Sequence, residues 1–548
     1  MLGFKLFVYK CCFVDRLQRY NYFRNWENFF EKVYFVVAVW KKKCIFALSR
    51  IMKKTFWYMK KRFLLVMAAC TLTMYAVAQT PRFEVMANQE SKKVDDEFVR
   101  ESKYIGQYDG LYCFVGEGRR HSKVLTLVDH NMVPLRSMTL PESTVNCKFI
   151  TGSVVGNNAG LLFMDNDERH RAFIYTATMD LDSMRSADSV GLRMIDSVGF
   201  SRKDNFMLWA ATSENGQYNA MIQVLEFTES RQYSAKVSLF DGRMHKLWSK
   251  DYAIGSMENL YVTNNGTVVS LGREPEGEET RFVYNIVSEK RANTYAAIVK
   301  CDPIRELRLA GVVDNHVLAV GLFTPQGARE RDNLCGGVVG ISFDMDSAII
   351  TGFTMRPFMN EDMNILLNKK TKKVQRSQQT DLVSLVGTTL TENGVVMAVG
   401  RNYAKDNVEN NGTITHLFYR MGLHLVAIDT QGRISWVRNI RRNDYEVGDD
   451  GMLNVCMLHN NGRTYIIKSE HRKYPAIYDI AKDVKEYKVG SKGNLVVYAI
   501  DSAGEVEKTI VYKKTPYGVV RGVLRADGKI ALFTQNGSRT RIVELKAL

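Results

Sequence analysis

Two histidines, His416 and His424, are the residues whose type and spacing come nearest to a metal site in this sequence. They stand eight positions apart on one predicted strand. Because side chains alternate between the two faces of a strand, this even spacing predicts that both lie on one face. Imidazole nitrogens are common zinc ligands, but no third ligand can be assigned to the pair. We therefore expect surface histidines or hydrogen-bonded core histidines.

A set of aspartates recurs where apolar strands run into turns. A carboxylate there accepts backbone N–H bonds, and the Gly that follows several of them supplies a positive φ, so these residues predict tight hairpins. The turn role accounts for the set without a catalytic or metal-binding role. The members are Asp129, Asp182, Asp241, Asp344, Asp429 and Asp501, with Asp302 as a looser member.

The other motifs of catalysis and metal binding are missing from the sequence. It has no His-Glu-x-x-His, no Gly-x-Ser-x-Gly, no P-loop and no calcium-loop ladder of aspartates. Five cysteines follow residue 78, and none forms a Cys-x-x-Cys pair. A bridge between Cys301 and Cys335 is one alternative, but buried thiols fit five scattered cysteines better. No catalytic residue, cofactor or metal is therefore predicted.

The elements that would position any site are short strands that recur roughly every 45 to 80 residues. Each begins with a small turn residue and continues with apolar positions. A repeat of this size in an all-strand sequence is typical of a radial array of small sheets, in which each unit buries its faces against its neighbours. The eight copies are Gly110–Val115, Gly160–Met164, Asn205–Ala210, Gly266–Leu271, Asn315–Val320, Gly394–Val399, Gly462–Ile467 and Gly528–Phe533.

This repeat predicts an all-β fold, a single β-propeller of eight blades with four strands each. In each unit the recurrent strand is the second strand, and it is followed by a third strand that ends at the turn aspartate and then by a fourth strand. The last unit ends after its third strand, so a segment within Pro81–Tyr104 is expected to supply the fourth strand and close the ring. Such closure pairs two edges that would otherwise be open. A seven-bladed ring is the alternative if the Gly160 copy belongs to an irregular first unit. Two packed sandwiches are the other architecture, which the repeat disfavours.

The N-terminal region differs from the rest of the chain. Met59-Lys-Lys-Arg62 precedes a 16-residue apolar run that ends in Ala76-Val-Ala78, as in a secretory signal peptide. The run is short for a membrane span, which needs about 20 residues. We assign 52–78 to the signal peptide, 79–548 to the propeller and 1–51 to an upstream extension from a misassigned start codon. A lipobox-like alternative would place a lipid anchor on Cys70.

The charge distribution argues against a nucleic-acid partner. The chain carries 75 Lys and Arg against 59 Asp and Glu, but residues 1–78 hold 15 of the basic and 3 of the acidic residues. The remaining 60 basic and 56 acidic residues leave the predicted propeller nearly neutral. A strongly basic folded domain, the usual mark of nucleic-acid binding, is therefore absent.

One insertion interrupts the strand pattern at about 358–381 and predicts a long loop with a short helix. Long ordered insertions on a rigid scaffold often carry function. Its basic residues are expected to form a solvated face rather than a patch for acidic ligands. They are Lys369, Lys370, Lys372, Lys373 and Arg376.

The segment from Asp429 through Gly432 to Trp436 resembles the repeat of pyrroloquinoline-quinone-type eight-bladed propellers, in which a Trp docks one blade on the next. Asp241 and Trp248 repeat the same offset. Most of the Trp series is missing, so the resemblance implies the fold and no quinone site. The overall layout also resembles uncharacterised exported β-propeller proteins of Gram-negative bacteria, a likeness that implies no particular activity.

Two functions follow from the sequence as hypotheses. The first is an exported cell-envelope propeller, periplasmic, secreted or associated with the outer membrane, that acts as a non-enzymatic binding or scaffold module for a protein or glycan. The alternative is a carbohydrate-active enzyme, a glycosidase or lyase, with an axial active site. Its discriminating feature is a pair of carboxylates about 5 to 10 Å apart in the axial pocket. Contact with a membrane is expected only if Cys70 is lipidated.

Overall fold

The computed structural model describes residues 83–87 and 102–547 with short gaps. These residues belong to one compact unit, Thr80–Leu548. The predicted upstream extension, signal peptide and Cys70 lie outside the described residues, as do the basic residues of the insertion. The gaps are 119–120, 131–132, 168–169, 188–190, 228–231, 253–256, 277–278, 326, 328–333, 369–379, 409–413, 449–450, 481–483, 526 and 537–538.

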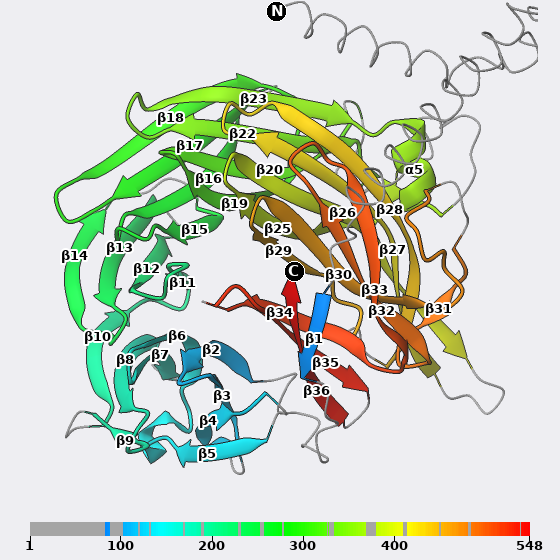
Figure 1. Cartoon of the computed structure of the whole chain (residues 1–548). Coiled ribbons are helices and arrows are strands. Elements are labelled where there is room, and N and C mark those ends of the chain that lie inside the picture. Colours follow the sequence, from blue (N-terminus) through cyan, green and yellow to red (C-terminus); the bar gives the residue numbers. More distant parts are fainter. Residues whose placement is uncertain are drawn as a thin grey trace, which may run out of the picture. The chain divides into compact units, whose positions relative to one another are not determined.

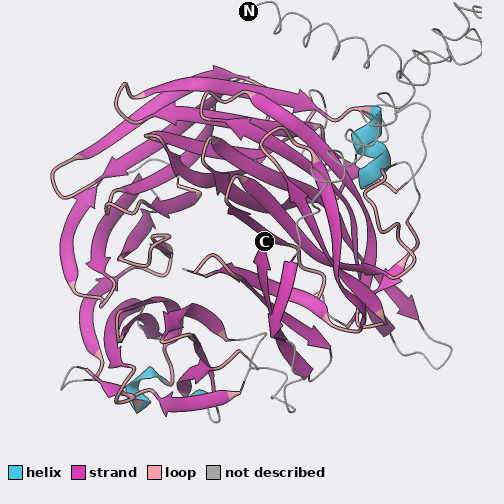
Figure 2. Ribbon diagram, viewed as in Figure 1, coloured by secondary structure: helices cyan, strands magenta, loops and turns pink. Residues whose placement is uncertain are grey.

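Almost all regular structure in the described residues is antiparallel β-sheet (Figure 2). Sheet 1 contains β2 (Lys103–Tyr108), β3 (Leu111–Glu117), β4 (Lys123–Val128) and β5 (Pro134–Thr139). Sheet 2 contains β6 (Lys148–Val155), β7 (Asn158–Asp167), β8 (Arg171–Asp180) and β10 (Arg193–Gly199), with the short β9 (Arg185–Ser186) paired to β8. Sheet 3 contains β11 (Asn205–Thr212), β12 (Tyr218–Phe227), β13 (Gln232–Asp241) and β14 (Lys246–Tyr252). Sheet 4 contains β15 (Asn259–Val262), β16 (Val268–Glu276), β17 (Glu279–Val287) and β18 (Ala292–Lys300).

The second half of the unit continues the same arrangement. Sheet 5 contains β19 (Ile304–Val313), β20 (His316–Phe323), β22 (Gly337–Asp344) and β23 (Ile349–Pro357). Sheet 6 contains β25 (Val383–Thr391), β26 (Gly394–Val408), β27 (Ile414–Asp429) and β28 (Ile434–Val447), joined by β31 (Tyr487–Lys488). Sheet 7 contains β29 (Cys456–Asn460), β30 (Arg463–His471), β32 (Gly493–Ile500) and β33 (Val506–Thr515). Sheet 8 contains β34 (Gly518–Leu524), β35 (Ile530–Asn536), β36 (Arg539–Ala547) and β1 (Phe83–Ala87).

In sheets 1 to 5 the first strand lies toward the centre and the fourth lies at the periphery (Figure 1). Consecutive first strands contact one another from β2 to β34. The all-β propeller prediction is therefore confirmed. In sheet 8, the fourth strand is β1 from the start of the described chain, paired antiparallel with β36. The Gly160 copy lies in β7, the second strand of a regular four-stranded arrangement.

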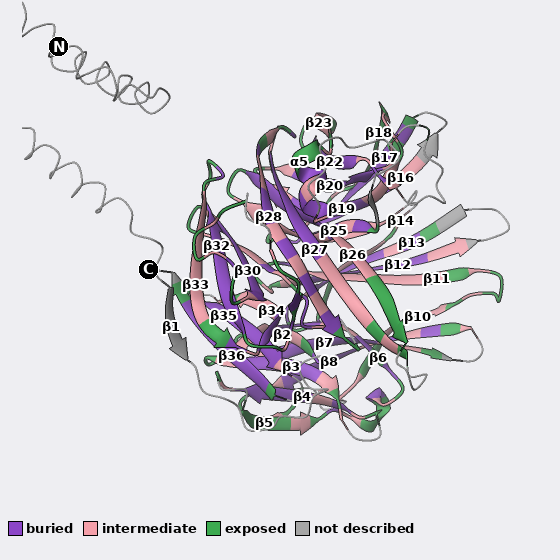
Figure 3. Cartoon of the chain, turned by 90° about the vertical axis from the view of Figure 1, so that its right-hand side faces the viewer, coloured by how far each residue is buried: buried purple, intermediate pink, exposed green. Residues whose placement is uncertain are grey.

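The core consists of apolar clusters between neighbouring sheets. One cluster lies at each junction from sheet 1 to sheet 8, and another joins sheet 8 to sheet 1 through Phe533 and Phe114, whose ring centroids are 5.4 Å apart. Because both faces of each sheet are covered, second and third strands are almost continuously buried, as β32 is (Figure 3). The peripheral β18 instead alternates between exposed and half-buried positions. The apolar runs in the sequence follow from this two-sided packing.

Seven of the eight recurrent strands are second strands, but the Asn205 copy is β11, the first strand of sheet 3. The turn aspartates act as predicted: the Asp429 carboxylate accepts the N–H groups of Gln431 and Arg433 at 2.9 and 2.8 Å. Two assignments were wrong. Asp180, not Asp182, accepts the Ser183 N–H in sheet 2, and Asp302 follows the fourth strand of sheet 4 rather than the third.

The predicted insertion contains α5 (Asn360–Leu366), followed after a gap by β24 (Thr380–Asp381), which pairs with β21 (Leu334–Cys335). The short helix is thus confirmed. Within the described part of the chain, no helix is long and apolar enough to cross a membrane.

The five cysteines of the unit are free, and four of them are buried. Cys301 and Cys335 therefore form no bridge. Trp436 packs in the cluster between sheets 6 and 7, so its predicted docking role is also met.

Candidate functional site

A cavity of about 410 Å³ lies where the first strands of sheets 6, 7 and 8 approach one another. We call it the axial cavity, after the central position of these strands (Figure 1). Its wall includes the start of β25, the chain leading into β29 and the middle of β34. The side chains that can form hydrogen bonds there are Thr388, Asn402, Arg420, Arg442, Asn454 and Arg521.

Three of these polar residues are positioned by the unusual length of the strands in sheet 6. β26, β27 and β28 contain 15, 16 and 14 residues, so they continue beyond the start of β25. In this extension Asn402 is paired with Arg420, and Arg420 with Asp444. Arg442 stands two residues before Asp444 and therefore on the same face of its strand. The extension thus presents one polar face to the cavity.

The other side of the cavity is held together by one backbone bridge and by hydrogen bonds from side chains to backbone carbonyls. Leu453 forms a parallel bridge with Val519, and the Asn454 Nδ2 donates to the Val520 carbonyl at 2.9 Å. Arg521 follows on β34 and donates from Nη2 to the Ser102 carbonyl at 3.3 Å. These contacts fix Arg521 at the junction between sheet 8 and the chain that enters sheet 1.

The charge of the axial cavity is unbalanced. No Asp or Glu is among the described residues that line it. Arg442 is ion-paired, since its Nε lies 2.7 Å from Asp444 Oδ2. For Arg521 the structure shows no carboxylate partner in the described parts of the chain, and burial lowers the pKa of its guanidinium. Excess positive charge in a partly desolvated cavity favours an anionic ligand.

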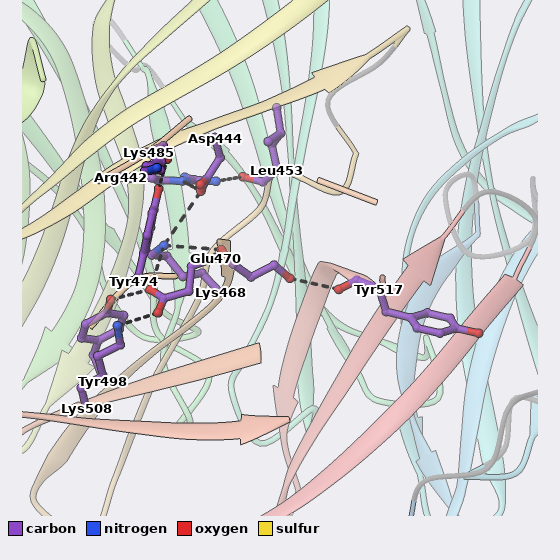
Figure 4. Close-up of polar contacts among 11 residues, drawn as sticks. Arg442, Asp444, Leu453, Lys468, Glu470, Tyr474, Lys485, Tyr498, Lys508 and Tyr517 are labelled. Carbon is purple, nitrogen blue, oxygen red and sulfur yellow. Dashed lines mark hydrogen bonds and ion pairs between the residues drawn. The ribbon is translucent and has the colours of Figure 1, made fainter. Parts of the chain in front are cut away.

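Behind Arg442 lies a buried set of charges that we call the charge network: Arg442, Asp444, Lys468, Glu470 and Lys508 (Figure 4). The Lys468 ammonium lies 3.9 Å from Asp444 Oδ2 and 3.6 Å from Glu470 Oε2. Lys508 approaches Glu470 Oε1 at 2.5 Å. Three cations thus share two carboxylates across the junction of sheets 6 and 7.

Tyr498 and the Pro475 carbonyl also contact this network. The Tyr498 hydroxyl donates to Glu470 Oε2 at 2.8 Å, and the Lys508 ammonium donates to the Pro475 carbonyl at 2.7 Å. Burial lowers the pKa of Lys508, although Glu470 opposes this effect. Burial and Glu470 raise the pKa of Tyr498 well above its ordinary value. Only Arg442 belongs both to the network and to the cavity wall.

The cavity wall offers no group suited to acid–base catalysis among the described residues. An arginine stays protonated, and amides and the Thr388 hydroxyl do not titrate near neutral pH. Burial raises the pKa of the lining Cys456 thiol to about 12, so the reactive thiolate is not formed. Two converging carboxylates, the feature expected of a glycosidase, are not found in this lining. The arrangement is suited to binding an anion.

The two histidines predicted to share a strand face are separated by the fold. His424 is buried, whereas the exposed His416 contacts Asp406. β26 residues 399 and 401 pair with His424 and Met421, so β27 carries one extra residue there. This bulge moves the two histidines to opposite faces, and the prediction of a shared face was wrong. Groups of three metal-ligating side chains are not found in the described residues.

His424 instead anchors the insertion. Asp362 of α5 accepts from Asn439 Nδ2 at 2.9 Å and lies 2.8 Å from Arg356 and 3.2 Å from His424. Burial alone would raise the pKa of Asp362, but His424, Asn439 and the Met359 N–H hold it well below its usual range. This set of buried polar contacts fixes α5 against β27 and β28.

The sequence predicted no site residues, and the structure shows why the three arginines were missed. Arg420 and Arg442 stand on neighbouring strands of sheet 6, while Arg521 is almost 80 positions further along the chain. No motif links them. The one available signal was the polar, charged continuation of the Gly394 strand beyond its apolar half.

No protein-family model matches the chain, and no curated protein matches it either. Among solved structures, the β-propeller domain of the Trilobed protease from Pyrococcus furiosus is 9% identical, with a TM-score of 0.33 over 75% of this chain and 96% of that chain. The polysaccharide lyase Uly1 is 11% identical, with a TM-score of 0.33 over 72% and 89%. The WD40 domain of SCAP from fission yeast is 7% identical, with a TM-score of 0.32 over 84% and 98%. Likeness at this level indicates no particular function.

Proposed function

We propose that this chain is an exported cell-envelope β-propeller that acts as a non-enzymatic binding module, with the axial cavity as its ligand site. The observation that carries the proposal is the cavity wall, whose described residues include three guanidinium groups and no carboxylate. Such a wall provides hydrogen-bond donors and positive charge for an anionic group. It lacks the pair of carboxylates that a glycosidase needs.

The export part of the proposal is supported by the basic Met59–Arg62 segment, the apolar run after it and the Ala76-Val77-Ala78 site. Expression of the full chain in a Gram-negative host, followed by N-terminal analysis of the envelope fraction, tests it. A mature terminus at Gln79 is expected. A chain retained in the cytoplasm with its leader intact would contradict export, and an acylated Cys70 would identify a lipoprotein.

The binding part is tested by presenting the full chain with an array of glycans and extracellular proteins, and by following the same mixtures for products. We expect retention of a ligand without turnover. Release of cleaved glycan would overturn the non-enzymatic proposal and support the alternative carbohydrate-active enzyme. Circular dichroism before and after binding checks that the sheets remain folded.

A further inference from the structure

We infer that the axial cavity holds an acidic sugar, a single carboxylate-bearing unit of a glycan, and that Arg521 binds its carboxylate. The inference rests on the proposed binding function and specifies its ligand. It is carried by the position of Arg521 in the cavity wall, the hydrogen-bonding groups opposite it and the size of the cavity.

Arg521 is the guanidinium best placed to receive a ligand anion. Its neighbour Arg442 is already engaged by Asp444 at 2.7 Å and by the Leu453 carbonyl at 2.5 Å. Arg521 has one hydrogen bond, to the Ser102 carbonyl, and burial lowers the pKa of its guanidinium. A ligand carboxylate would compensate that charge and match the planar fork of the guanidinium with two parallel hydrogen bonds.

The amides of the cavity wall point to hydroxyl groups on the same ligand. Asn402 Nδ2 donates to Ser384 at 2.5 Å, and Asn454 Nδ2 donates to Val520. Within the described residues, the Oδ1 atoms of both amides accept no hydrogen bond. Sulfate has no donor for them, whereas a sugar ring presents hydroxyl donors beside its carboxylate.

Shape and lining agree with one sugar unit. The volume of about 410 Å³ is near the lower end of ligand cavities, which span about 300 to 1,000 Å³. Val386, Val455 and Val520 supply apolar surface for the C–H groups of a ring. The Thr388 hydroxyl on the same wall can both donate to and accept from a sugar hydroxyl.

Calorimetric titration of the full chain tests the inference. The probes are oligosaccharides that contain galacturonate or glucuronate, their carboxyl-reduced neutral counterparts, sodium sulfate, and a peptide with a free or amidated C-terminus. We expect binding of an acidic oligosaccharide and a loss of at least about tenfold on carboxyl reduction, the scale of a charge-assisted hydrogen bond. Equal binding of the neutral counterpart, binding of sulfate or the free peptide alone, or no binding of any acidic probe would overturn the inference.

Variants assign the interaction to the cavity. Arg521→Gln should weaken binding of the acidic probe at least about tenfold, and Arg521→Lys should weaken it less. Arg433→Gln is the matched control, because Arg433 lies in a turn with 76% of its side chain exposed. Thr388→Val provides a second cavity variant if Arg521→Gln fails to fold. Equal affinities of all variants would overturn the cavity assignment.

The two proposals fail in different ways. A neutral glycan or a protein that binds equally well to the wild type and to Arg521→Gln would leave the binding function standing and overturn the acidic sugar. Cleavage of an acidic oligosaccharide that still depends on Arg521 would overturn the non-enzymatic function and support the ligand class.

Discussion

Replacing Glu470 by Gln removes one of only two negative charges in the charge network. The wild-type carboxylate lies 2.5 Å from Lys508 and 3.6 Å from Lys468, and it accepts the Tyr498 hydroxyl at 2.8 Å. Glu470 itself is fully buried. The substitution keeps the side-chain volume and an oxygen that can accept from Tyr498, so the change is chiefly one of charge.

The expected cost follows from the two lysines that stay buried. Removing one partner of a buried ion pair destabilises a protein by about 3–5 kcal/mol, because the remaining charge loses its compensation in a medium of low polarity. The single Gln oxygen can still accept from Tyr498, but the amide NH2 group then faces the Lys508 ammonium, so two donors meet there. We therefore expect a loss within this range, about 3–5 kcal/mol.

The assay is urea unfolding of the full chain at neutral pH, followed by far-UV circular dichroism and tryptophan fluorescence. Glu505→Gln is the matched control. Glu505 pairs with Arg438 at 3.4 Å, but its side chain is 80% exposed. An exposed pair of this kind contributes about 0.2–1 kcal/mol. Raising the salt concentration should reduce the small effect of the control and leave the Glu470→Gln effect nearly unchanged.

Equal losses of unfolding free energy for Glu470→Gln and Glu505→Gln would refute this expectation. The buried carboxylate beside Lys468 and Lys508 would then stabilise the protein no more than an exposed carboxylate does. The double variant Glu470→Gln with Lys508→Met provides an internal check. If the charges of Glu470 and Lys508 are coupled, the double variant should lose less free energy of unfolding than the two single variants lose in sum.

Three further predictions concern the packing between sheets and the insertion. Because the pKa of Asp362 is depressed in the folded protein, its charge contributes stability above the ordinary Asp pKa of about 3.9, and this contribution is lost as the pH falls. Asp362→Asn should therefore lower the urea midpoint at neutral pH. As the pH is lowered below about 4, the midpoint of the variant should fall less than that of the wild type. A variant with the pH profile of the wild type would contradict this. Gly504→Ala should lower the thermal midpoint more than Gly462→Ala. Both glycines have a positive φ, but only a Cβ at position 504 would lie close to another side chain, 2.7 Å from the Trp436 ring. Equal shifts of the thermal midpoint would show that the Trp436 ring moves aside at no cost in stability. Alkylation of the native chain followed by peptide mapping should modify Cys301 before the four buried cysteines of the unit. Burial raises the pKa of all five thiols, but only Cys301 is partly exposed to the reagent; early labelling of a buried cysteine would argue against this packing.

Much of the fold could be predicted because its signals are local. An apolar second strand is buried on both faces wherever it stands in a propeller, so the Gly394 and Gly462 copies were assigned correctly without knowledge of their neighbours. The Asn205 copy was misassigned because β11 and β12 are both apolar, and composition does not distinguish a first strand from a second. The turn at Asp429 was predictable since its hydrogen bonds reach only four residues along the chain.

The sequence by itself determined the strand repeat, the hairpin turns, the docking Trp436 and the short helix of the insertion. Each depends on residues close together in the chain. Only the tertiary structure decided that one extra residue in β27 separates His416 from His424, and that Arg420, Arg442 and Arg521 meet at one cavity. The physical reason is that strand pairing and sheet packing bring together side chains that no local pattern connects, and burial then sets the energy of their charges.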